Sequence, residues 1–192
     1  ARRYGKAPVA KGYRKSYERE DALMEFDKLL LQRRSTREYT DGPVTKDEID
    51  YILNAGIRAP SARNMQSWHF YAVTDPQVRQ KFKKFCAEWV SSAPVIFVIC
   101  TDGDAMIEAA GEKKGTKFIT QDTALAMENM LLAAANIGLG GCIIGAYDDD
   151  ICRSELNIPQ KYSPVALMPV GEPAKEPALR ERKPLEDVVT YI

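Results

Sequence analysis

The stretch "FITQDTALAMENMLLAAANI", residues 118–137, sets the architecture of this 192-residue chain. Its apolar side chains recur at helical spacing and cover most of the circumference of the helix that they predict. We expect such a helix to be buried on nearly all sides, against a core, a partner subunit, or both. The apolar positions are Ala124, Leu125, Met127, Met130, Leu131, Leu132, Ala133, Ala134 and Ile137.

Three further helices and one loop are predicted around this segment. Thr45 followed by Glu48 forms a capping box at the start of one helix. The Asp75-Pro76 pair opens another helix. Residues 102–117 are polar and interrupted by glycine, which predicts a loop. The predicted helices span 21–34, 45–58 and 75 to about 89.

Four segments are predicted as strands. The run "PVIFVIC" (94–100) is continuously apolar, as expected of a strand that is buried on both faces. "SWHFYAVTD" (67–75) is rich in aromatic and β-branched residues. Two more strands are predicted after the long helix, at 140–147 and 164–171. Because helices and strands are interleaved, we expect a layered α/β sheet.

Composition is that of one globular domain. Apolar residues make up 45% and charged residues 28%, and the 27 basic residues balance the 27 acidic ones, so no basic excess points to nucleic acid. No apolar run approaches the ~20 residues of a membrane span, and no secretory signal is recognisable. Four scattered cysteines and one histidine make a metal site unexpected, and they favour a cytoplasmic protein with reduced thiols.

Basic residues gather at residues 1–20, which we predict to form an arm outside the core. Residues 21–192 are then a single domain that ends in a polar tail. The basic residues of the arm are Arg2, Arg3, Lys6, Lys11, Arg14, Lys15 and Arg19.

Three arginines lie within five positions in "LLLQRRSTREYT" (29–40). Basic side chains at a helix end suit the helix dipole and usually face water. The alternative is an anion site, because guanidinium groups bind phosphate bidentately and a neighbouring hydroxyl adds a donor. The side chains concerned are Arg33, Arg34 and Arg37, with Ser35 between them.

A second segment, "APSARNMQSWHF" (59–70), also allows two interpretations. Asn64 and Gln66 carry amides, which offer both a donor and an acceptor and suit the edge of a heterocycle. They could equally cap backbone groups in a plain loop between a helix and a strand.

Two glycine-rich or basic segments complete the set. "GLGGCIIGA" (138–146) admits close backbone approach to a flat ligand, or simply ends a helix before a core strand. "LRERKP" (179–184) adds Arg180 and Arg182, which otherwise lie in an exposed tail. Neither a Rossmann glycine pattern nor a P-loop is present, so side chains would hold any phosphate.

The four segments, in this order and spacing, resemble the nitroreductase family of FMN-dependent oxidoreductases. The resemblance covers about residues 22–190. It implies an α+β fold with three α/β/α layers around a central mixed, mainly antiparallel sheet. It also implies a homodimer with FMN at the subunit interface, a C-terminal tail that packs on the partner, and NADH or NADPH as reductant.

The resemblance assigns roles to individual residues. Arg33 and Ser35 match residues that hold the FMN phosphate, and Arg37 matches a basic residue near the pyrimidine edge of the flavin. The segment from Pro60 to Asn64 matches one that the other subunit supplies, and Ile144 with Gly145 matches backbone near the flavin N5. The expected cofactor-binding set is Arg33, Arg34, Ser35, Arg37, Pro60, Ser61, Ala62, Asn64, Gln66, Ile144, Gly145, Arg180 and Arg182.

The expected activity is ping-pong reduction of nitroaromatics, quinones or similar small oxidants by NADH or NADPH. No catalytic side chain or metal is expected, because the flavin carries the chemistry. One alternative is a flavin sink or sensor without turnover. Another is a module that binds nucleic acid through the basic arm, which the neutral net charge disfavours. No residue selects the physiological substrate.

Overall fold

A computed structural model describes residues 26–192. The predicted basic arm, 1–20, and the first part of the predicted helix 21–34 lie outside the described residues. The described part of that helix is α1 (Phe26–Gln32). It ends just before Arg33, so the arginine cluster follows the helix and is not part of it.

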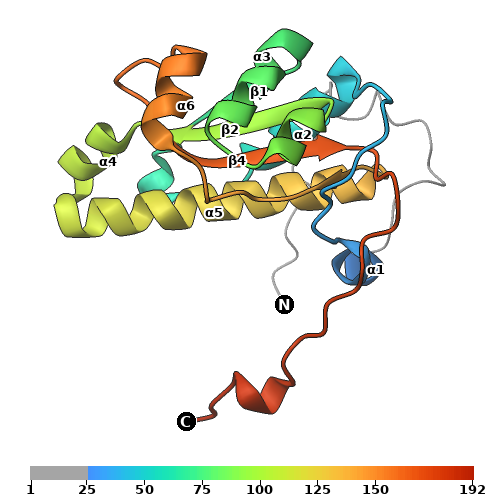
Figure 1. The fold of residues 1–192 in the computed structure, drawn as a ribbon. Helices are drawn as coiled ribbons and strands as arrows, with labels where there is room; N and C mark the ends of the chain where they lie inside the picture. The colour runs from blue at the N-terminus through green and yellow to red at the C-terminus, as the bar shows by residue number, and fades with distance from the viewer. Residues whose placement is uncertain (1–25) are drawn as a thin grey trace.

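A four-stranded sheet forms the centre of the fold (Figure 1). The strand order is β1-β2-β4-β3, and all neighbouring strands are antiparallel. One parallel bridge, between Ser35 and Gly141, joins the segment after α1 to the sheet. The implied α+β class with a mixed, mainly antiparallel sheet is therefore confirmed. The strands are β1 (Trp68–Val73), β2 (Val95–Thr101), β3 (Gly140–Gly141) and β4 (Ser163–Gly171).

The predicted strand 140–147 is wrong beyond its first two residues. After β3 the chain makes only one further bridge to β4, between Ile144 and Leu167. Pro169 of β4 lies opposite this gap and accepts a bond from Cys142 N (3.3 Å). Because proline has no N–H to return, the ladder cannot continue there.

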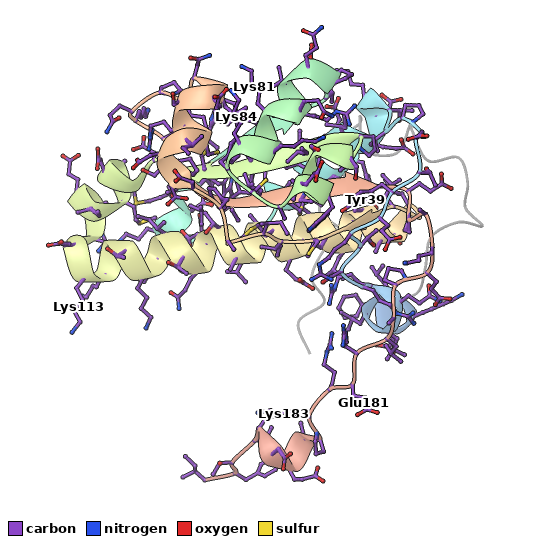
Figure 2. The ribbon with its side chains drawn as sticks, viewed as in Figure 1. Tyr39, Lys81, Lys84, Lys113, Glu181 and Lys183 are labelled. Atoms are coloured by element: carbon purple, nitrogen blue, oxygen red, sulfur yellow. The ribbon has the colours of Figure 1, made fainter. Side chains whose placement is uncertain are left out.

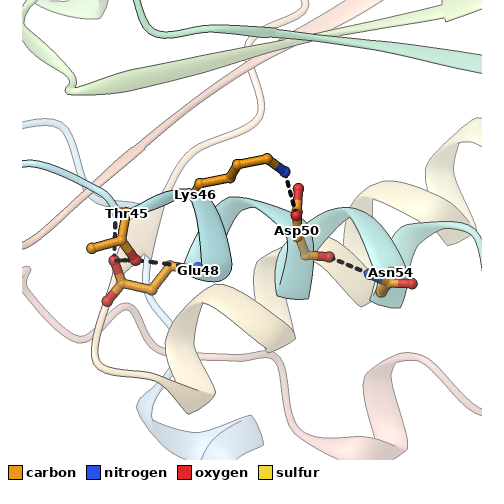
Figure 3. A network of polar contacts seen from close by, with 5 residues as sticks. All are labelled: Thr45, Lys46, Glu48, Asp50 and Asn54. Carbon is orange, nitrogen blue, oxygen red and sulfur yellow. Dashed lines mark hydrogen bonds and ion pairs between the residues drawn. The ribbon is translucent and has the colours of Figure 1, made fainter. Parts of the chain in front are cut away.

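Two helices cover one face of the sheet. They are α2 (Lys46–Gly56) and α5 (Glu112–Asn136), and α5 runs along the sheet as the long helix of Figure 1. The predicted capping box of α2 is confirmed (Figure 3). Glu48 Oε2 accepts from Thr45 N (2.7 Å), and Thr45 Oγ1 accepts from Glu48 N (3.3 Å).

Shorter helices cover the opposite face, namely α3 (Pro76–Gln80) and α6 (Asp149–Leu156). The predicted helix from Asp75 to about Trp89 begins correctly, with Asp75 capping two N–H groups, but it gives way to 3-10 turns after Gln80. Phe85 and Val90 are both buried in the core on this face of the sheet, whereas a straight α-helix would place their side chains about 140° apart around its axis. Burial therefore overrides the helical pattern.

The predicted loop 102–117 is wrong. It contains α4 (Gly103–Ala110) and the first turn and a half of α5. Gly111, with φ of +79°, ends α4 and separates it from α5. Gly115 is a packing residue instead, since a Cβ there would lie 2.8 Å from the Ile107 Cα.

The buried strand β2 separates two apolar cores. Val95, Phe97 and Ile99 pack against α2 and α5, while the alternate residues, Ile96 and Val98, pack against the other layer. Every residue of β2 is buried, as predicted. The three expected layers are thus confirmed.

Within one subunit, the core buries only part of the long helix. Met127, Met130 and Leu131 are buried in the core. Ala124 and Leu125 of the predicted apolar set are exposed in this chain. The C-terminal tail passes α1 and leaves the body of the molecule (Figure 1). Within residues 26–192, none of the helices has the length and apolar character that a membrane crossing requires.

Candidate functional site

A pocket of about 440 Å³ lies between the segment after α1 and the C-terminal tail. Figure 2 shows the two parts of the chain that meet here, with Tyr39 at the level of the sheet and Glu181 and Lys183 on the tail. Six of the predicted cofactor-binding residues line this one pocket. They are Arg33, Arg34, Ser35, Arg37, Arg180 and Arg182.

Backbone contacts with the sheet fix the first of these parts. Thr36 N donates to Gly141 O (3.1 Å), and the Thr36 side chain is buried so closely that a Cβ on Gly140 would meet its Oγ1 at 2.1 Å. The Tyr39 hydroxyl donates to the carbonyls of Thr36 (2.8 Å) and Pro169 (3.1 Å). Burial raises the pKa of Tyr39, so its hydroxyl stays a neutral donor. The side chains on either side of Thr36 therefore project from an anchored backbone.

Arg34 joins this part to the tail. Its Nη1 donates to the Glu176 carboxylate and to Pro177 O, both at 2.7 Å. Its Nε is buried and has no hydrogen-bond partner among the described residues. An unsatisfied buried cationic donor is costly.

The donor set of this pocket fits a phosphate dianion. Guanidinium groups offer paired N–H donors, and Ser35 adds a hydroxyl. Among residues 26–192 the Arg33 side chain makes one long ion pair, 3.8 Å from its Nε to Glu128, and Arg182 donates to the backbone of Arg180. Glu38, the acidic neighbour of Arg37, pairs with Lys175 instead (2.7 Å).

A second group of predicted residues forms a strained segment, Pro60–Gln66. Arg63, Asn64 and Gln66 all have φ between +52° and +56°. Left-handed backbone costs about 1–3 kcal/mol at each non-glycine residue and is concentrated at ligand sites. Gln66 N donates to Ser61 Oγ (3.0 Å), which closes the segment on itself.

The strained segment does not line the arginine pocket of the same chain. Pro60, Asn64 and Gln66 are exposed, and Ser61 and Ala62 are partly buried. The structure therefore separates the predicted site residues into distinct groups within one subunit.

Ile144 and Gly145 form a third group beside β4. Ile144 exchanges two backbone hydrogen bonds with Leu167 (2.8 and 3.0 Å), which fixes this stretch. A Cβ added to Gly145 would meet no atom within 4 Å among the described residues. The packing of the chain does not require glycine here, and the space in front of it admits a flat ligand.

One residue that supports the strained segment is not among the predicted site residues. Asp122 lies on α5 and is buried, with 3% of its surface exposed. Both of its carboxylate oxygens accept from Ala62 N, at 3.0 and 3.1 Å. The only signal in the sequence is an acidic residue at the start of an apolar stretch, because its partner lies 60 positions earlier.

The sequence is similar to known proteins over most of its length. The Nitroreductase family profile matches residues 30–172. A protein of Methanothermobacter thermautotrophicus, named as a candidate NADH dehydrogenase/NAD(P)H nitroreductase, is 32% identical over 164 residues, 82% of each chain.

Solved structures agree as well. A nitroreductase family protein from Streptococcus pneumoniae superposes with a TM-score of 0.81 over 88% of this chain and all of that one; at 23% identity it shows the fold. The NADPH:FMN oxidoreductase of Vibrio harveyi, solved with NAD+, has a TM-score of 0.77 and 27% identity, covering 86% of this chain and 76% of that one. The resemblance seen in the four segments is thus confirmed, and the chain belongs to the nitroreductase family of oxidoreductases.

Proposed function

We propose that the protein is an FMN-dependent oxidoreductase that takes reducing equivalents from NADH or NADPH and passes them to nitroaromatics, quinones or similar small oxidants. One observation carries the proposal. Arginines from opposite ends of the chain converge on one pocket, where the Ser35 hydroxyl adds a further donor. The names of relatives support the cofactor pair, since the Vibrio harveyi enzyme is an NADPH:FMN oxidoreductase.

Each group of residues has a task in this proposal. Arg33, Ser35 and Arg182 hold the FMN phosphate, and Arg34 keeps the tail in place so that Arg180 and Arg182 reach it. When bound, FMN supplies hydride and electron transfer between the nicotinamide and the oxidant.

The remaining site residues contact the flavin ring in this proposal. Arg37 lies at the edge of the ring, where it places a guanidinium cation. Gly145 leaves room for the ring, and the backbone beside it is fixed by Ile144. Because one pocket accepts the reductant and then the oxidant, the kinetics are ping-pong.

The strained segment completes the site of a second subunit in this proposal. It lies outside the arginine pocket of its own chain, and its amides are exposed. Large apolar side chains on α1 and on the tail are also exposed, including Leu31 at 74% and Tyr191 at 86%. A homodimer that buries these surfaces explains both features. A cytoplasmic location stays a prediction.

Anaerobic titration of the FMN-loaded protein with NADH and with NADPH tests the function. We expect the flavin absorbance to bleach and to return when a quinone or a nitroaromatic is added. Flavin that binds but does not bleach would favour the sink or sensor. A protein that cannot be loaded with FMN would contradict the proposal.

A further inference from the structure

We propose that Asp122 is a positioning residue for the flavin: it sets the shape of the segment Ser61–Gln66 and thereby aims the amides of Asn64 and Gln66 at the ring. The proposal rests on the proposed function, because these amides have no ring to meet otherwise. Asp122 itself is buried behind the segment, so it acts through that segment and not by direct contact.

The contact between Asp122 and Ala62 is specific. Ala62 is the first residue of the 3-10 turn Ala62–Asn64. The first N–H groups of such a turn have no partner inside it. The capping residue Ser61 makes no side-chain cap bond to the turn, and both oxygens of Asp122 supply the acceptor instead (3.0 and 3.1 Å). A carboxylate is a stronger acceptor than a neutral oxygen, so this bond holds the entry to the turn firmly.

The bond controls the residues that follow. Arg63, Asn64 and Gln66 are all left-handed, a geometry that persists only where the surroundings over-determine it. The surroundings hold the first two residues of the turn. Asp122 holds Ala62 N, and Arg63 Nη1 donates to Ala109 O at the end of α4 (2.6 Å).

The support is also rigid. Asp122 lies well inside α5, a helix of 25 residues that packs against the sheet and against α2. Its neighbour Thr123 is fully buried, so the helix is closely packed at this point. Loss of the carboxylate therefore frees the segment while the helix that bears it stays in place.

The variants Asp122→Ala and Asp122→Asn test the proposal through two ligands, FMN and riboflavin. Asp122→Ala removes the acceptor, and we expect both flavins to bind about tenfold more weakly. Asp122→Asn keeps one acceptor oxygen, and we expect about a threefold loss. The preference for FMN over riboflavin stays at the parent value, because the phosphate contacts are intact. The visible absorption and circular dichroism of the bound flavin shift in both variants, because the amides at the ring edge have moved.

Asp75→Ala is the matched control. Asp75 also accepts two hydrogen bonds from backbone N–H groups (2.7 and 3.1 Å), but at the start of α3, beyond the other end of β1. We expect its melting temperature to fall while flavin affinity and spectrum stay at the parent values.

The outcomes separate the two proposals. Folded Asp122 variants with the affinity and spectrum of the parent would overturn the role of Asp122 and leave the flavin function standing. If Asp122→Ala does not fold, Asp122→Asn decides by the same two readouts. A parent protein that binds neither flavin would overturn the proposed function and the role of Asp122 with it.

Discussion

The arginine pocket and the strained segment hold their parts of the site in opposite ways. The pocket depends on charged side chains, and its link between Arg34 and Pro177 spans 143 positions of the chain. The segment is seven residues long, and its geometry is fixed by backbone angles and one buried carboxylate. Charge attracts a dianion from many directions, whereas a fixed backbone accepts a ligand in one orientation. The first arrangement suits affinity and the second suits alignment.

Removing the phosphate from the ligand has the largest expected effect, because it tests whether the arginine pocket binds that group. We expect the parent protein to bind riboflavin at least a hundredfold more weakly than FMN. Two or more charge-assisted bonds are lost, each worth about 1.5–3 kcal/mol. Fluorescence titration of both flavins measures the ratio. Equal affinities would show that the arginine pocket does not bind the phosphate.

Arg33→Ala removes one side of the pocket. We expect FMN affinity to fall by about tenfold or more while riboflavin affinity stays unchanged, in contrast to the equal losses of both flavins expected for the Asp122 variants. Arg33→Lys keeps the charge but loses the paired donors, so its loss is smaller.

Arg153→Ala is the control for the Arg33 variants. It removes an arginine that bonds the carbonyls of Pro159 and Tyr162, outside the arginine pocket. We expect it to bind FMN as the parent does. Parallel losses of FMN and riboflavin in Arg33→Ala would mean that the variant perturbs the fold.

Arg37 separates ring chemistry from phosphate binding within one cluster. A fixed cation beside the flavin favours the reduced, more negative state, so Arg37→Gln lowers the two-electron potential of bound FMN. We expect a shift of roughly 30 mV, which corresponds to about 1.4 kcal/mol, with most of the FMN affinity retained. Anaerobic redox titration measures the shift. An unchanged potential with intact binding would place Arg37 on the surface with no role at the ring.

Mixed dimers test whether the two regions serve different subunits. Arg33→Ala and Asn64→Ala chains, co-expressed with different tags, place both lesions in one site and none in the other if the segment crosses the interface. We expect one of the two sites in each mixed dimer to bind FMN with parent affinity, which is half the number of such sites in the parent dimer. If each subunit used its own segment, every site would carry one lesion and no parent-like site would remain.

Thr45→Ala has the smallest expected effect on the flavin, namely none. It removes the capping box of α2 and costs about 1 kcal/mol, which lowers the melting temperature by roughly 2–4 °C. Calorimetry measures the shift and flavin titration the affinity. Weaker FMN binding in this variant would mean that any loss of stability reaches the site.

Sequence predicts best where the deciding contacts are local. The capping box of Thr45 and Glu48 lies within one turn, and β2 is apolar at nearly every position, so both were predictable. The sequence predicts a loop at Gly115, because its packing partner Ile107 becomes a neighbour only once α4 and α5 fold together. The predicted strand 140–147 stops early because Pro169, which lies opposite Cys142 in β4, has no N–H to donate.

The same distinction between local and distant contacts applies to the site residues. The six residues of the arginine pocket were predicted from short motifs whose order resembles a known family. Asp122 has no local signature, since its partner lies 60 positions away. The left-handed backbone of Arg63 has no signature in the sequence either, because distant contacts hold it, namely Asp122 with Ala62 N and Ala109 O with the Arg63 side chain.

The contact of Arg34 with Pro177 also orders events during biosynthesis. The ribosome adds about 5–20 residues per second, so the 143 positions between these residues take roughly 7–30 seconds to synthesise. During that interval the nascent chain can form α2, the β1-β2 pair and α5 in turn, but β4 comes only near its end and one wall of the pocket does not yet exist. In the proposed function, FMN can therefore meet all of its phosphate contacts only after the tail has been synthesised.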